Sequence, residues 1–119
     1  MQSLLNFIQD SPSPWHAGVE IQKQLKKAGF KELDEKEHFS LKAGGKYFIS
    51  RGHSSVIAFC VPKNDPVSST ILVSHTDTPA LRLKPQGEYV ANNTVYWSAQ
   101  VYGGPLYSSW QNRELGFVR

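Results

Sequence analysis

The stretch that most constrains the fold of this chain is the apolar run Thr70–Ser74, because it leads directly into the triplet His75-Thr76-Asp77 and then to Pro79. A short run of this composition predicts a buried strand, and the proline ends it. Enzymes of the α/β class keep their chemistry at the ends of such strands. The run therefore draws attention to the imidazole and the carboxylate that follow it.

His75 and Asp77 are two residues apart, so in an extended chain their side chains lie on the same face. Asp77 can then accept a hydrogen bond from one imidazole nitrogen, while the other nitrogen stays free for a metal. The triplet alone is weak evidence, because polar residues after a strand commonly cap it and begin a turn. On this pattern, the metal-site and turn interpretations both stay open.

Two helices are predicted before the first strand. Apolar spacing indicates a short amphipathic helix over 2–9. The second helix is marked at both ends: Ser13 is a suitable N-cap, Pro14 fits the first helical position, and Gly29 is a typical left-handed stop. A polar, glycine-containing loop is expected over 31–45.

Two hairpins are predicted from β-branched and aromatic residues. The first joins strands over 46–51 and 54–61 through Gly52-His53, and the second turns at Asn92-Asn93 within 88–97. Cys60 lies in the first hairpin and is expected to be a small buried hydrophobe. The aromatic residues of both hairpins are expected to pack rather than to form a stacking platform for nucleic acid: Tyr47, Phe48, Tyr96 and Trp97.

Charge and composition exclude some classes of partner. Thirteen basic and ten acidic residues give a net charge of +3, but the bases are scattered, and the only cluster, Lys23, Lys26 and Lys27, reads as a solvated helix face. We therefore expect no nucleic-acid partner. The apolar runs are too short to span a bilayer and the first residues carry no basic stretch, so we expect no membrane partner. A single cysteine forms no internal disulfide, and a cytoplasmic location is the expectation.

Several motifs follow one another along the chain in a distinctive order. They are the Ser-Pro-x-Pro-aromatic-His pattern of 11–16, Tyr47-Phe48 with Arg51, the stretch from His75 to Pro79 with 81–84, Tyr102-Gly103-Gly104, and Trp110 with Arg113 and Leu115. This ordered set runs from about Leu4 to Arg119 and resembles the amino-terminal portion of the M18 aspartyl aminopeptidases, which are dinuclear zinc exopeptidases.

The resemblance implies a role for each residue of the candidate site. His75 would be a ligand of one of two zinc ions, and Asp77 would be the catalytic-site residue that orients or polarises the site. The implied reaction is the removal of an amino-terminal acidic residue from a peptide by a zinc-activated water. The bridging carboxylate, the other ligands and the glutamate base would lie beyond residue 119, so the chain is expected to be inactive alone and to bind zinc weakly.

The resemblance also implies a domain organisation and partners. The implied fold class is α/β. Residues 1–84 would form the amino-terminal part of the catalytic domain, an incomplete zinc-exopeptidase-like mixed sheet with flanking helices, and residues 85–119 would begin an inserted β-rich domain. Besides the peptide substrate, we expect homo-oligomers or association with the missing remainder. The alternative is a non-catalytic truncated remnant that serves at most as a binding or oligomerisation module.

Some residues are expected to take no part in the chemistry. His16 is expected to form a structural hydrogen bond near a helix start, and His38 and His53 are assigned no role. Asn112 departs from the family pattern Trp-x-Asp-Arg-Asp-Leu, because it replaces a carboxylate by an amide. This change questions a structural salt bridge or a subunit contact rather than a metal ligand.

Overall fold

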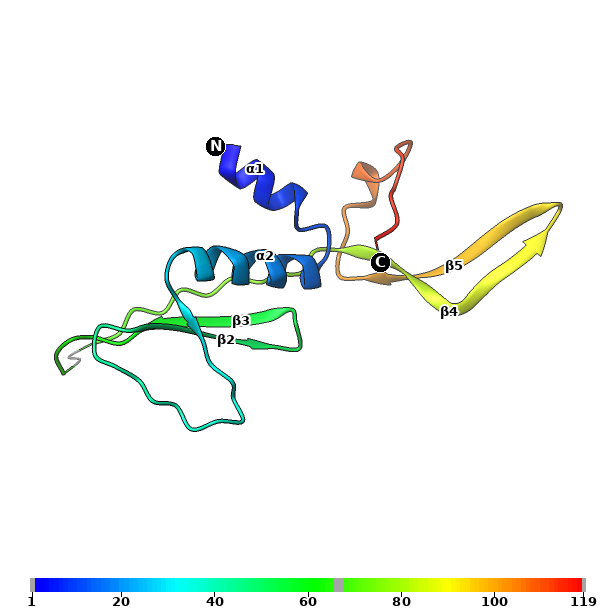
Figure 1. The fold of residues 1–119 in the computed structure, drawn as a ribbon. Helices are drawn as coiled ribbons and strands as arrows, with labels where there is room; N and C mark the ends of the chain where they lie inside the picture. Colours follow the sequence, from blue (N-terminus) through cyan, green and yellow to red (C-terminus); the bar gives the residue numbers. More distant parts are fainter. Residues whose placement is uncertain (1, 66–67, 119) are drawn as a thin grey trace. The chain divides into compact units, whose positions relative to one another are not determined.

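The computed structural model of the chain describes residues 2–65 and 68–118. These residues form two compact units, the first over 1–77 and the second over 78–119 (Figure 1). The first unit carries two helices and a mixed sheet, which confirms the predicted α/β class. The predicted domains over 1–84 and 85–119 stay a prediction.

Helix α1 spans Gln2–Gln9, and helix α2 spans Pro14–Lys27. Ser13 is the N-cap of α2, as predicted: its backbone is extended, and its hydroxyl accepts a hydrogen bond from the His16 backbone N–H at 3.4 Å. Pro14 has no N–H to leave unsatisfied, so it suits the first helical position. The start of α2 therefore follows from its local sequence.

The end of α2 follows from Gly29, which adopts a φ of 82°. The Gly29 N–H donates to the Lys26 carbonyl at 3.1 Å, and the Phe30 N–H donates to the Leu25 carbonyl at 3.0 Å. These two bonds form a Schellman motif, which satisfies carbonyls that the helix leaves open. The predicted left-handed stop is confirmed.

The sheet of the first unit has the strand order β1-β2-β3, with β1 at Lys31–Glu32, β2 at Lys46–Arg51 and β3 at Ser55–Cys60. Strands β1 and β2 are parallel, and β2 and β3 form the predicted antiparallel hairpin. The turn over 52–54 that joins them has two left-handed residues, Gly52 and His53, with φ values of 59° and 62°. Helix α2 contacts all three strands.

The core of the first unit is built on strand β2. Among the described residues, the buried hydrophobic side chains are Ala17, Tyr47 and Phe48. Neighbours on a strand point to opposite faces, so β2 is covered on both sides. The Lys26 ammonium of α2 lies 5.8 Å from the Phe48 ring centre, and the Tyr47 hydroxyl accepts from the Lys42 backbone N–H at 2.9 Å. The helix thus covers one face, and the loop before β2 covers the other.

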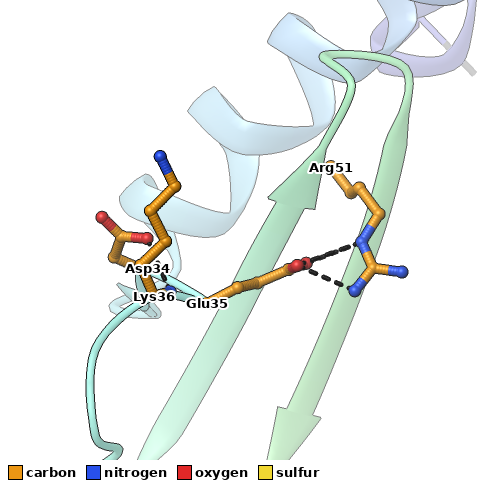
Figure 2. A network of polar contacts seen from close by, with 4 residues as sticks. All are labelled: Asp34, Glu35, Lys36 and Arg51. Atoms are coloured by element: carbon orange, nitrogen blue, oxygen red, sulfur yellow. Dashed lines mark hydrogen bonds and ion pairs between the residues drawn. The ribbon is translucent and has the colours of Figure 1, made fainter.

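An ion pair ties the loop that follows β1 to the end of β2 (Figure 2). The Glu35 carboxylate accepts from Arg51 Nε at 2.9 Å and from Arg51 Nη2 at 2.8 Å, while the Lys36 backbone N–H donates to Asp34 Oδ1 at 3.0 Å. The hydrogen bond and charge of Arg51 lower the pKa of Glu35, and those of Glu35 raise the pKa of Arg51. Arg51 of the ordered motif set therefore has a structural partner.

The second unit is a long antiparallel hairpin of β4 (Ala80–Ala91) and β5 (Thr94–Tyr102), followed by the short 3-10 helix η1 (Tyr107–Ser109). The predicted turn at Asn92-Asn93 is confirmed, with φ values of 49° and 58°. Aromatic side chains of the hairpin pack in pairs. The ring centres of Tyr89 and Tyr96 are 5.1 Å apart in a stacked arrangement, and the ring centres of Trp97 and Phe117, which follows the hairpin, are 5.2 Å apart.

Two expectations about the interior are wrong. Residues 70–74 form no strand, and the side chains of Ile71, Leu72 and Val73 are 79%, 93% and 89% exposed. An apolar run becomes a strand only beside a partner, and the described residues offer it none. Cys60 is exposed rather than buried, because β3 is the edge of the described sheet and its outward face is uncovered. In the described parts, no helix is long and apolar enough to cross a membrane.

Candidate functional site

The structure brings His75 and Asp77 into contact. His75 Nδ1 lies 2.6 Å from the Asp77 backbone carbonyl oxygen and 3.4 Å from the carboxylate oxygen Oδ1. A carbonyl oxygen can only accept, so this geometry assigns the proton to Nδ1. The other nitrogen, Nε2, then carries the lone pair that a metal needs.

The contact differs in one respect from the sequence expectation. The closer acceptor is the backbone oxygen of Asp77, and its carboxylate is the more distant partner. Both acceptors favour the same tautomer, since both face Nδ1. The His75 side chain is 79% exposed and that of Asp77 is 42% exposed, so the imidazole is open to further ligands.

Thr76, between these two residues, anchors the triplet to the β2–β3 turn. Its hydroxyl Oγ1 donates to the Ser54 backbone carbonyl at 2.8 Å, across 22 residues of sequence. The turn is also approached closely by α2: a Cβ added to Gly18 would lie 2.1 Å from the His53 carbonyl oxygen. Sequence reasoning missed both contacts, although a glycine inside a helix is itself a signal of close backbone approach.

The described residues fit one ligand position rather than a complete zinc site. A catalytic zinc ion uses about three protein ligands, and His75 with its Nδ1 occupied suits one of them. Within 2–65 and 68–118, no group of three or more His, Cys, Asp or Glu side chains could hold a metal. A site with about three protein ligands would therefore need at least one ligand from outside the described residues.

The remaining residues to place are those expected to take no part in the chemistry. His16 Nδ1 lies 2.6 Å from the Ser13 hydroxyl, which confirms its structural hydrogen bond at the start of α2. His53 lies in the β2–β3 turn, and His38 lies on the exposed loop before β2. Asn112 adopts a φ of 54°, a conformation that asparagine accepts more readily than most residues.

Sequence comparison matches most of the chain to the model of one protein family. The model of the family described as Aminopeptidase I zinc metalloprotease (M18) matches residues 7–118. A protein of Pseudomonas paraeruginosa named "Probable M18 family aminopeptidase 2" is 37% identical over 119 residues, which covers 98% of this chain and 28% of the relative.

Solved structures give the same result. The chain is similar to Chaetomium thermophilum mApe1 with a TM-score of 0.81 and 32% identity, covering 92% of this chain and 26% of that one. It is similar to mApe1 of S. cerevisiae, solved as a dodecamer, with a TM-score of 0.77 and 26% identity, covering 94% and 27%. The chain thus spans 28% of the length of the first curated relative, and about a quarter of these structures.

Proposed function

The chain belongs to the M18 family of zinc aminopeptidases, and we propose that it supplies the amino-terminal part of such an enzyme, with His75 as a zinc ligand. The observation that supports this role most strongly is the hydrogen bond from His75 Nδ1 to Asp77. It fixes the tautomer in which Nε2 is unprotonated, and neutral imidazole is a good zinc ligand.

The proposed mechanism assigns one task to each residue. His75 would hold one of two zinc ions through Nε2, and Asp77 would keep the imidazole in the required tautomer and orientation. Zinc, when bound, lowers the pKa of a coordinated water and so supplies the nucleophile for peptide hydrolysis. The remaining ligands, including the carboxylate that the resemblance implies between the two ions, and the general base would come from residues outside this chain. The preference for an amino-terminal acidic residue rests on the resemblance to the aspartyl aminopeptidases.

The proposal extends to partners and location. Remaining ligands would come from the rest of a family-length protein, whether covalently joined or separately encoded. Oligomer formation is supported by the S. cerevisiae relative, which was solved as a dodecamer. A cytoplasmic location is supported by the free, exposed Cys60, since a reducing compartment keeps such a thiol from oxidation.

A chimera tests the proposed site. Residues 7–118 would replace the matching segment of the Pseudomonas paraeruginosa relative, which supplies the rest of a family-length chain. We expect zinc-dependent release of amino-terminal aspartate or glutamate from short peptides. The His75→Ala variant should lower kcat/KM by at least about 100-fold, because a metal ligand is lost.

The matched control is His38→Ala, which removes an exposed imidazole from a loop outside the candidate site. It should leave kcat/KM within about twofold of the unchanged chimera. Full activity of the His75→Ala chimera would contradict the proposed ligand role. The 119-residue chain alone should show no peptide hydrolysis with zinc, manganese or cobalt. Metal-dependent hydrolysis by this chain that is abolished by His75→Ala would contradict the proposal that the other ligands lie outside the chain.

A second candidate function is a non-catalytic role in binding or oligomerisation. It is supported by the many exposed apolar side chains of the described residues, which include Ile57 at 66% and Leu72 at 93%. Large apolar surface of this kind is typical of interfaces. A chimera that folds but never hydrolyses acidic peptides, whatever metal is added, would favour this second function.

A further inference from the structure

We propose that Thr76 is a positioning residue that holds His75 in its metal-ready tautomer by tying the triplet to the β2–β3 turn. The anchoring contact is the hydrogen bond from Thr76 Oγ1 to the Ser54 carbonyl at 2.8 Å. Thr76 itself touches neither nitrogen of the imidazole in the contacts described above, so its effect has to pass through the backbone. The claim that this tautomer serves metal binding rests on the proposed function, whereas the claim that Thr76 fixes the tautomer of His75 does not depend on it.

The triplet needs an anchor because its own segment forms no regular structure. Residues 68–79 lie in neither a helix nor a strand, and the His75 side chain is 79% exposed. The short contact between His75 Nδ1 and the Asp77 carbonyl requires a particular backbone conformation across Thr76. The hydrogen bond of the Thr76 hydroxyl restricts that conformation, because Thr76 lies between His75 and Asp77 on the same short piece of backbone.

The acceptor end of the anchor is itself well fixed. Ser54 closes the turn over 52–54, whose residues Gly52 and His53 both adopt left-handed φ values. On its other side, the turn meets Gly18 of α2 so closely that a Cβ there would clash with the His53 carbonyl oxygen at 2.1 Å. The Ser54 carbonyl is therefore held by a hairpin and a packed helix, and it offers Thr76 a rigid partner.

Two substitutions separate the hydroxyl from the shape of the side chain. Thr76→Val keeps the β-branched shape and removes the donor, whereas Thr76→Ser keeps the donor and removes a methyl group. Thr70→Val makes the same chemical change at an exposed position of the same segment and serves as the matched control. Circular dichroism of each variant shows whether the helices and the sheet are retained.

The readout is the tautomer of His75, which loss of general stability would not by itself change. Nitrogen-15 NMR of the labelled chain, at about pH 8.5 where imidazole is neutral, distinguishes Nδ1–H from Nε2–H. The His75 signals are assigned by their absence in His75→Ala. We expect Thr76→Val to lower the ratio of Nδ1–H to Nε2–H by about 2- to 10-fold, the range for loss of one hydrogen bond. Thr76→Ser should restore the ratio, and Thr70→Val should leave it unchanged.

The outcomes separate the positioning role from the zinc site. A folded Thr76→Val chain with an unchanged tautomer ratio would overturn the positioning role, as would a Thr76→Ser chain that behaves like the valine variant. Zinc added to the unchanged chain should shift Nε2 of His75 more than Nδ1. A shift at Nδ1 instead would count against the proposed ligand role, while the tautomer ratios would still decide the role of Thr76.

Discussion

The Phe48→Ala substitution should remove much of the stability of the first unit. Phe48 is 0% exposed and is the largest fully buried side chain among the described residues. Truncation of a buried phenylalanine costs about 3–5 kcal/mol, through lost burial and the cavity that remains. A unit of 77 residues is expected to have a free energy of unfolding of about 4–12 kcal/mol, so this single change would remove about a quarter of it or more.

Urea denaturation followed by far-UV circular dichroism measures this loss, because α2 and the sheet depend on the same core. The matched control is Phe39→Ala, which deletes the same atoms from a side chain that is 36% exposed. The control should cost about 1 kcal/mol, since fewer contacts are lost. Equal losses for the two variants would refute the view that β2 carries the core of the first unit.

Three further predictions concern an ion pair, a helix end and the surface. Arg51 lowers the pKa of Glu35, so the ion pair stabilises the fold above the ordinary carboxyl pKa, and this stabilisation is lost as the pH falls through the lowered pKa. Glu35→Gln should therefore reduce the dependence of the free energy of unfolding on pH in the acid range, measured by urea denaturation. Gly29→Ala should cost about 1 kcal/mol in the same assay because of its φ of 82°, and an unchanged midpoint would contradict the left-handed stop. Exposed apolar side chains such as Leu72, 93% exposed, should make the chain self-associate at micromolar concentration, and sedimentation showing only monomer would refute this.

The parts of the fold that the sequence predicted are those set by local chemistry. Ser13 and Pro14 begin α2 and Gly29 ends it, because capping and backbone handedness act within a few residues. The turn at Asn92-Asn93 is correct for the same reason, since both residues accept left-handed conformations. The β4–β5 hairpin extends beyond the predicted 88–97, because its outer pairs depend on the register of the whole hairpin rather than on the turn.

The parts that the sequence did not predict depend on distant partners. Residues 70–74 have the composition of a strand but lack a neighbour to pair with in the described residues, and Cys60 is exposed at the end of the edge strand β3. The pairing of Glu35 with Arg51 joins residues 16 apart, and no local pattern indicates it.

The same distinction between local and distant contacts applies to the candidate site. Contact between His75 and Asp77 was predictable, because two residues of separation already place them together. The anchor from Thr76 to Ser54 spans 22 residues and could be found only in the structure. The described residues contain no group of three or more His, Cys, Asp or Glu side chains that could hold a metal, so they do not show a complete zinc site.

The proposal that His75 binds zinc is tested most directly by zinc-edge anomalous diffraction from crystals of the chimera. The expected result is a zinc peak about 2.0–2.1 Å from His75 Nε2, with Nδ1 still facing Asp77. A fully occupied zinc site that leaves His75 unbound, or binds it through Nδ1, would contradict the proposed role of this residue.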